Sequence, residues 1–190
     1  MISNIYQLGE DQRLYVPYPP GKGSHTTNVG FIDLRSQPER IAEIHELRGF
    51  PEFEELVRAL NAPESAVRTL RIDTAKDEFP RDEYPRSFFS MLTFCFEAFH
   101  GDDDKRYYID LYRFFVQLAS HFLPADDVQV DFYLVPFTVQ VSNNGWALEI
   151  RVYGYGKSED DARSAWVRGF MQVSEFMHRI ESENRKPPST

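Results

Sequence analysis

Residues 128–180 read VQVDFYLVPFTVQVSNNGWALEIRVYGYGKSEDDARSAWVRGFMQVSEFMHRI. Asn144-Gly145 is a strong hairpin signal, because a type I′ turn needs positive φ at both central residues. A two-residue loop there pairs apolar residues on one face of the hairpin and polar residues on the other. The apolar pairs are Val141 with Leu148, Val139 with Ile150 and Phe137 with Val152, and the polar pairs are Gln140 with Glu149 and Thr138 with Arg151. We therefore expect a β-hairpin that turns at Asn144-Gly145.

The apolar residues change phase at Pro136. They stand at even positions from Val128 to Leu134 and at odd positions beyond the proline. A strand with a period of two requires a bulge or a break for such a change, and proline is tolerated at both. Two interpretations stay open: a kinked edge strand, or a bulge that re-aims side chains beside a site.

A long amphipathic helix is predicted directly after the hairpin. Ser158 is a suitable N-cap, and the acidic residues 159–161 suit the positive end of the helix dipole. The residues that follow have helical spacing over about six turns. Large apolar residues in this pattern predict a helix packed on a sheet; they are Ala162, Ala165, Trp166, Phe170, Val173, Phe176, Met177 and Ile180.

The rest of the chain alternates between strand and helix patterns. Residues 88–99 fit either type, but their length, their Phe content and the Gly-Asp turn that follows favour a strand. The other predicted strands are 14–16, 29–34 and 68–73. The other predicted helices are a short one from Ser36 to Gly49, one from Pro51 to Asn61 and one from Lys105 to Leu123.

A weak internal repeat supports this assignment. Shifting the sequence by 55 residues aligns Gly101 with Gly156, Arg113 with Arg168, Phe115 with Phe170 and Gln117 with Gln172. The second half would then hold two ββα-like units. We predict an α+β fold with a mostly antiparallel sheet and helices packed on one face. The expected single domain spans 1–182, with an irregular segment at 1–28 and a flexible tail at 183–190.

Composition excludes several classes of function. The net charge of −9 argues against a nucleic-acid or anionic-membrane surface, since both need clustered Lys and Arg. The single cysteine, Cys95, excludes an internal disulfide and Cys-rich zinc sites. Residues 1–13 show no signal-peptide pattern, and no apolar run approaches the roughly 20 residues that span a bilayer. We expect a cytoplasmic protein without a cofactor.

A tandem near-repeat supplies the candidate binding residues. Residues 77–81 read DEFPR and residues 82–86 read DEYPR, so two prolines and a high charge density predict a loop. Phe79 and Tyr84 would be exposed anchors for a protein partner. In the alternative, both rings pack against the domain and only the charges face water. The candidate partner-binding residues are Asp77, Glu78, Phe79, Asp82, Glu83 and Tyr84.

Catalytic motifs are absent from the sequence. No histidine pair has metalloprotease spacing, no Gly-x-Ser-x-Gly occurs, and Cys95 has no identifiable base. His100 and Asp102 are the weak metal candidates, because carboxylates cluster after them. That stretch is too short for a Ca²⁺ loop and equally suits a helix N-cap. We therefore assign no catalytic residue.

The favoured function is a non-catalytic, acidic binding protein that engages a protein partner of basic character. Small inhibitors, immunity proteins and secretion chaperones share this size and charge. The alternative is a small enzyme with a carboxylate and histidine site that could hold a metal. A homodimer is compatible with either function.

Overall fold

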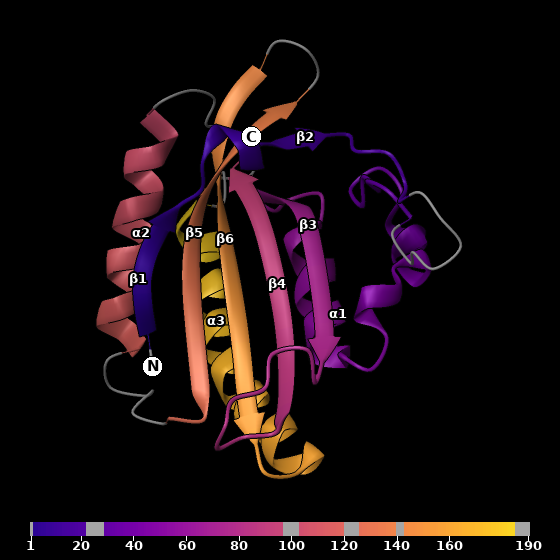
Figure 1. The fold of residues 1–190 in the computed structure, drawn as a ribbon. Coiled ribbons are helices and arrows are strands. Elements are labelled where there is room, and N and C mark those ends of the chain that lie inside the picture. Colours follow the sequence, from indigo (N-terminus) through magenta and orange to yellow (C-terminus); the bar gives the residue numbers. More distant parts are fainter. Residues whose placement is uncertain (1, 22–28, 97–102, 120–125, 140–142, 185–190) are drawn as a thin grey trace.

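The computed structural model describes residues 2–21, 29–96, 103–119, 126–139 and 143–184. Within them the fold is α+β, with six strands in one mixed sheet and three α-helices (Figure 1). The strands are β1 (Ile2–Gln7), β2 (Leu14–Val16), β3 (Val67–Lys76), β4 (Arg86–Phe96), β5 (Val128–Val139) and β6 (Asn143–Gly156). The helices are α1 (Pro51–Leu60), α2 (Asp103–Ala119) and α3 (Glu159–Asn184).

The sheet is mostly antiparallel, as predicted. Its order is β1-β5-β6-β4-β3, and β2 also pairs with β5. The β3–β4, β4–β6 and β5–β6 pairs are antiparallel, whereas β1 and β2 run parallel to β5. Along the chain, β3-β4-α2 is followed by β5-β6-α3, so the order ββα occurs twice. The strand predicted over 88–99 is confirmed up to Phe96, and residues 97–99 lie outside the described ranges.

All three α-helices pack on one face of the sheet, which we call the helix face (Figure 1). The eight apolar residues predicted to face the sheet from α3 are all buried. Trp166 stacks on Phe170 and donates its indole N–H to Ser90 Oγ at 3.0 Å. α3 also rests directly on the β6 backbone, because a Cβ at Gly154 would lie 2.1 Å from the Trp166 nitrogen.

The predicted start of α3 is confirmed. The backbone N–H of Asp161 donates to Ser158 Oγ, and the Ser158 N–H donates back to the Asp161 carboxylate, both at 3.2 Å. This reciprocal arrangement satisfies N–H groups that the first turn leaves free. No helix in the described part of the chain combines the length and the apolar character needed to cross a membrane.

The predicted hairpin register is wrong. Leu134 pairs with Leu148 and Phe132 with Ile150, while Asn144 and Gly145 lie inside β6. The strands pair as far as Val139 with Asn143, and residues 140–142, which include the predicted partners Gln140 and Val141, lie outside the described ranges. The observed register buries three apolar pairs under the helices, Val130 with Val152, Phe132 with Ile150 and Leu134 with Leu148. Each buried large apolar side chain contributes about 1.5–3 kcal/mol, which outweighs the preference of a single turn.

Pro136 neither kinks an edge strand nor marks a bulge. β5 pairs continuously with β6 and is flanked on its other edge by β1 and β2. The even-numbered residues of β5 from Val128 to Leu134 pack on the helix face, whereas Val135 and Phe137 are buried on the opposite face. The phase change therefore reflects burial on both faces. Pro136 lies between the residues that pair with β1 and those that pair with β2, where a missing N–H is tolerated.

The N-terminal part differs most from expectation. The segment 1–28, expected to be irregular, contributes β1 and the predicted strand β2. Residues 29–34 form no strand, although Ile32 and Leu34 are buried. The helix expected after Ser36 consists of two 3₁₀ turns, Pro38–Glu43 and His45–Leu47. Helix α1 is confirmed, with Pro51 in its first turn.

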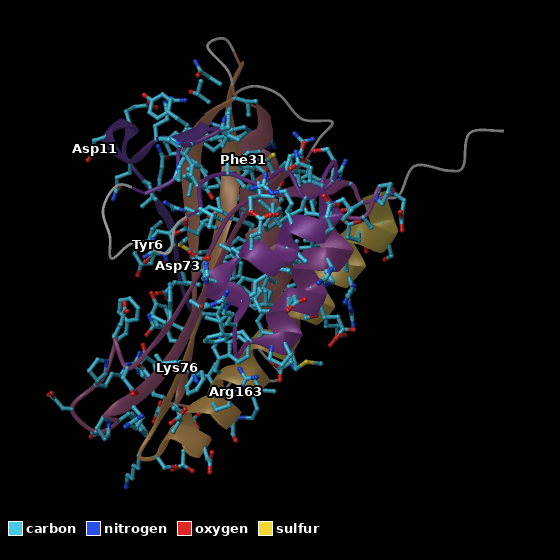
Figure 2. All side chains as sticks on the ribbon, turned by 90° about the vertical axis from the view of Figure 1, so that its right-hand side faces the viewer. Tyr6, Asp11, Phe31, Asp73, Lys76 and Arg163 are labelled. Carbon is cyan, nitrogen blue, oxygen red and sulfur yellow. The ribbon has the colours of Figure 1, made fainter. Side chains whose placement is uncertain are left out.

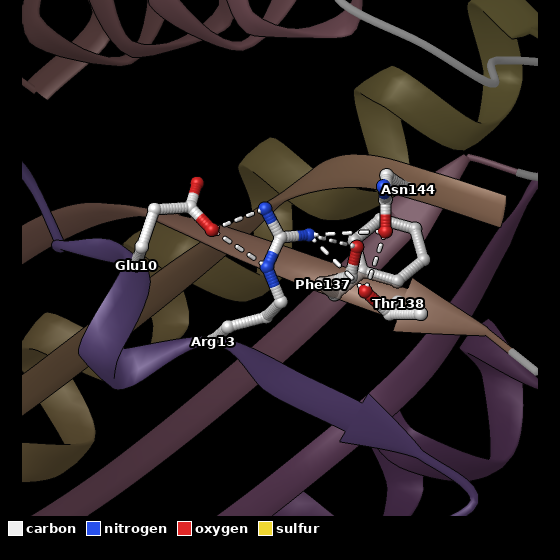
Figure 3. Close-up of polar contacts among 5 residues, drawn as sticks. All are labelled: Glu10, Arg13, Phe137, Thr138 and Asn144. Carbon is white, nitrogen blue, oxygen red and sulfur yellow. Dashed lines mark hydrogen bonds and ion pairs between the residues drawn. The ribbon is translucent and has the colours of Figure 1, made fainter. Parts of the chain in front are cut away.

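Arg13 links the N-terminal segment to the β5–β6 hairpin through hydrogen bonds (Figure 3). Its Nε donates to Glu10 Oε2 at 2.8 Å, and its Nη1 donates to Phe137 O and Thr138 Oγ1, both at 3.1 Å. Asn144 Oδ1 accepts from Arg13 Nη1 at 3.3 Å and from Thr138 Oγ1 at 2.7 Å. The predicted turn residue Asn144 thus serves as an acceptor between neighbouring strands.

Candidate binding site on the open face of the sheet

No α-helix of the described residues covers the second face of the sheet, which we call the open face (Figures 1 and 2). At one end the N-terminal residues Leu14 and Val16 pack on an apolar patch formed by Leu70, Cys95, Val135, Phe137 and Ala147. At the other end the loop 77–85 packs on a second patch formed by Phe89, Met91, Tyr153 and Tyr155. The surface between the two patches is charged.

We call the charged residues between the patches the charged belt: Arg71, Asp73, Asp131, Glu149 and Arg151. Strand register places them in two neighbouring rows across the sheet. Asp131 pairs with Arg151, which pairs with Met91 and then Asp73. In the next row Tyr133 pairs with Glu149, which pairs with Thr93 and then Arg71. Paired residues point to the same face, so these side chains gather on the open face.

Glu149 is the centre of the charged belt and is 0 % exposed. Its Oε2 accepts from Arg71 Nη2 at 2.6 Å and from Thr93 Oγ1 at 2.8 Å. Its Oε1 accepts from Arg151 Nε at 2.7 Å. Burial alone would raise the pKa of Glu149, but the charges of Arg71 and Arg151 and the hydrogen bonds outweigh it, so the pKa is lowered. Glu149 therefore stays ionised and fixes both guanidinium groups.

Asp131 is the second buried acid of the charged belt and is 5 % exposed. Its Oδ2 accepts from Gln129 Nε2 at 2.7 Å. Its Oδ1 is buried and has no hydrogen-bond partner among the described residues. Although Arg151 is its direct neighbour across the strands, both arginines of the charged belt bind Glu149. Within the described part of the chain, Asp131 is thus a buried carboxylate whose one hydrogen bond comes from a neutral amide.

Tyrosine rings surround the charged belt. Tyr6 stacks on Tyr133 with ring centroids 5.2 Å apart, and the Arg151 guanidinium lies 4.1 Å from the Tyr133 centroid. Tyr6 is 45 % exposed and lies on the side of the sheet away from α1 and α3 (Figure 2). Tyr153 and Tyr155 are stacked with centroids 6.1 Å apart. The open face therefore carries tyrosine rings, among them the well-exposed ring of Tyr6, beside the acids of the charged belt.

The hydroxyl of Tyr153 stays protonated at neutral pH. Burial raises the pKa of Tyr153 to about 12, and the nearby Asp131 charge adds to that rise, while Arg151 partly offsets it. Burial likewise raises the pKa of Tyr133. Both side chains are therefore neutral hydrogen-bond donors, and the ring of Tyr133 already holds the Arg151 guanidinium on its face.

Asp73 extends the charged belt to the outer strand β3. Its side chain is exposed, but neighbouring atoms still desolvate the carboxyl group, and this effect comes first in raising the pKa of Asp73. The nearby charges of Glu78 and Glu149 raise it further, whereas the Thr74 N–H and Arg71 lower it. Asp73 therefore holds its proton more readily than a free aspartic acid, chiefly because neighbouring atoms desolvate it.

The loop residues predicted as partner-binding lie at one end of the open face. Phe79 is 41 % exposed, yet its ring lies 4.8 Å from Phe89 and 5.6 Å from Tyr153. The Tyr84 ring lies 6.4 Å from that of Tyr155. Both rings thus pack on the sheet, and Phe79 keeps an exposed part.

The acids of the same loop point outward. Asp77 forms an ion pair with Arg86 at 2.7 Å and accepts a hydrogen bond from the Ser87 N–H at 3.0 Å. Glu78, Asp82 and Glu83 are exposed. The structure therefore brings these acids to the rim of the open face, and their role in binding stays a prediction.

The metal candidates His100 and Asp102 lie outside the described residues. Within the described ranges, no group of three or more His, Cys, Asp or Glu side chains is placed to hold a metal ion. Cys95 is buried in the apolar patch under the N-terminal segment.

The sequence interpretation did not single out the charged belt. It placed Glu149 and Arg151 on the polar face of the hairpin but did not connect them with Arg71 or Asp131, which lie on other strands. One local signal existed: Glu149, Arg151, Tyr153 and Tyr155 alternate along a single strand and so share one face. Alternating charges and tyrosines on a strand indicate a surface that is only partly solvated.

Comparisons with protein families, with curated proteins and with solved structures found no match for this chain. The geometry and charge of the open face are therefore the basis for assigning a function.

Proposed function

We propose that this protein is a non-catalytic binding protein that engages a basic segment of a protein partner on the open face of its sheet. The observation that carries this proposal is the charged belt with its tyrosines, left between two covered apolar patches. Tyrosine and arginine are, together with tryptophan, enriched among the residues that dominate binding energy at protein interfaces. Tyr6, Tyr133 and Arg151 form such a cluster, and Tyr6 is well exposed.

Pre-organisation supports the same conclusion. Glu149 holds Arg71 and Arg151 from both of its oxygens, so the two guanidinium groups lose little further freedom when a partner binds. Fixed side chains lower the entropic cost of association. Glu149 itself has both oxygens occupied and a lowered pKa, which suits a structural anchor and not a proton-transfer group.

The charge around the open face favours a basic partner. Exposed acids flank it at both ends, with Glu10 and Asp11 in the first 3₁₀ turn and Glu78, Asp82 and Glu83 in the loop (Figure 2 labels Asp11). The whole chain carries a net charge of −9. Such a field steers a basic partner toward the face and raises the association rate in a salt-dependent way. An inhibitor, immunity protein or chaperone of similar size and charge is the kind of protein that we propose.

The proposal is tested by comparing three versions of the tagged protein as bait in lysate of the source cells at low and high salt. The versions are wild type, the open-face variant Y6S/Y133S and the control M171S, which changes an exposed residue of α3 on the other side of the molecule. Circular dichroism and a thermal melt establish that each variant is folded.

We expect wild type and M171S to retain the same basic protein at low salt and to lose most of it at high salt. Y6S/Y133S should retain at least tenfold less of that protein. Equal capture by Y6S/Y133S would place the interface elsewhere and contradict the proposal. If capture did not depend on salt, the proposed electrostatic attraction of a basic partner would be wrong.

A further inference from the structure

We propose that Asp131 is the receptor for an arginine side chain of the partner, whose guanidinium group hydrogen-bonds to Asp131 Oδ1 on the open face. This inference rests on the proposed function and names the contact that would give it specificity. It is carried by the distribution of charges within the charged belt.

The charged belt contains two buried acids and two arginines, but both arginines bind the same acid. Arg71 and Arg151 both bind Glu149, with nitrogen–oxygen distances of 2.6 Å. Asp131 forms no ion pair among the described residues and keeps one oxygen without any partner. A buried charge without a counter-charge is costly, and such groups are normally paired in folded proteins.

Distance does not explain the missing ion pair. Asp131 and Arg151 are direct neighbours on antiparallel strands, a position in which opposite charges normally stabilise a sheet. Arg151 instead directs both Nε and Nη2 to Glu149 and lies over the ring of Tyr133. Arg151, the cross-strand neighbour of Asp131, therefore pairs with Glu149, and a cation of the partner is left to pair with Asp131.

The surroundings of Asp131 suit a guanidinium group. The open face already holds two such groups on tyrosine rings, Arg151 at 4.1 Å from Tyr133 and Arg81 at 3.8 Å from Tyr155. Planar guanidinium groups stack on aromatic rings and hydrogen-bond at the same time, which favours arginine over lysine. Tyr133 and Arg151, the neighbours of Asp131, are partly exposed, and these side chains must move for a guanidinium group to reach the buried Oδ1.

Gln129 holds the acceptor in place. It donates from Nε2 to Asp131 Oδ2, while its Oε1 accepts hydrogen bonds from Arg81 Nη2 and, at 3.4 Å, from the Tyr155 hydroxyl. Asp131 Oδ2 is therefore occupied from inside the protein. The free oxygen, Oδ1, is the atom left for the incoming donor.

The test is an NMR titration of the full chain with Nα-acetyl-arginine amide. Nα-acetyl-citrulline amide is the uncharged probe of equal shape, and Nα-acetyl-lysine amide is the second cation. The variants are D131N and the control D110N, which changes an exposed acid of α2 on the other side of the sheet.

We expect the arginine probe to shift the amide resonances of residues 131, 133 and 153 saturably in wild type and D110N. Citrulline should not shift them, and D131N should weaken binding at least tenfold. No saturable shift in wild type would overturn the proposal. A lysine probe that binds as tightly as the arginine probe would overturn the choice of arginine.

Thermal stability separates a receptor from a structural carboxylate. We expect the melting temperature of free D131N to equal or exceed that of wild type, because the substitution removes an uncompensated buried charge. A clear fall in the melting temperature would mean that Asp131 is already satisfied within the protein, for instance by an internal water, and would overturn the proposal.

The outcomes for the two proposals differ. If wild type and D131N bind the captured partner equally while Y6S/Y133S does not, the arginine contact is wrong and the open-face function stands. If the arginine probe binds at Asp131 but Y6S/Y133S captures the partner normally, the arginine site stands and the partner interface lies elsewhere.

Discussion

The two faces of the sheet differ in how they treat polar groups. On the helix face, the buried Ser90 accepts from Trp166 and the buried Thr69 bonds with Asn61, while Arg163 Nη1 of α3 is a buried polar atom there without a partner among the described residues. On the open face, Glu149 binds two arginines, whereas Asp131, which is also buried, forms no ion pair with the residues that the structure describes. The helix face is therefore organised for stability. The open face keeps a costly, unpaired group, as binding sites often do.

The largest effect is expected on the helix face. Trp166→Ala removes a side chain that is 0 % exposed and packs on Phe50 and Phe170. The cavity and the lost burial should lower the free energy of unfolding by about 3–5 kcal/mol. Urea denaturation measures this loss, and Met171→Ala, an exposed change in the same helix, should stay within about 0.5 kcal/mol. A loss for Trp166→Ala no larger than for open-face variants would erase the contrast between the faces.

A smaller loss is expected from the anchor of the open face. Glu149→Gln leaves Arg71 and Arg151 without their shared counter-charge. Both arginines are partly exposed, so the loss should be about 2 kcal/mol, below that for a fully buried pair. Glu175→Gln, which breaks an exposed ion pair with Arg179, is the matched control and should cost about 0.5 kcal/mol or less. Equal losses for the two variants would show that burial does not strengthen the Glu149 network.

The contribution of Glu149 should also depend on pH in one direction. Its pKa in the folded protein lies below the ordinary value of 4.5, so the folded state favours the ionised form. The stability that this provides is present above about pH 4.5 and is lost as the pH falls through the lowered pKa. The difference in unfolding free energy between wild type and Glu149→Gln should therefore be constant near neutrality and shrink in acid. Urea titrations from pH 7 to pH 3 measure it, and a difference that grows on acidification would contradict the assignment.

The smallest effect is expected where the N-terminal part joins the hairpin. Arg13→Ala removes the contacts to Phe137, Thr138 and Asn144 (Figure 3). These bonds lie near the surface, so the global loss should be about 1 kcal/mol. Amide exchange should rise locally at residues 137–139 and 144, while exchange on the helix face stays unchanged. Uniform acceleration over both faces would show that Arg13 supports the whole domain.

The helix face could be predicted from the sequence, and the open face only in part. Helical spacing from Ala162 to Ile180 and the alternation in β4, β5 and β6 report local periodicity, which a single sequence carries. The register of β5 and β6 depends on distant segments that bury both faces of β5. The Asn144-Gly145 turn signal therefore predicted the wrong register. β1 was missed because it pairs in parallel with a strand more than 120 residues away.

The charged belt was missed for the same reason. Arg71, Asp131 and Glu149 come from three strands, and only the sheet order places them together. The loop acids Glu78, Asp82 and Glu83 were identified from composition, and their exposure agrees with that interpretation. The packing of Phe79 and Tyr84 on the sheet depends on the aromatic patch below them, which no local pattern reveals.

The most direct test of the contrast between the faces is a crystal structure of the protein grown with Nα-acetyl-arginine amide. We predict a guanidinium group within hydrogen-bonding distance of Asp131 Oδ1, with Arg71 and Arg151 still bound to Glu149. A structure in which Arg151 turns to Asp131, or in which an ordered water satisfies Oδ1 and no probe is bound there, would contradict the account.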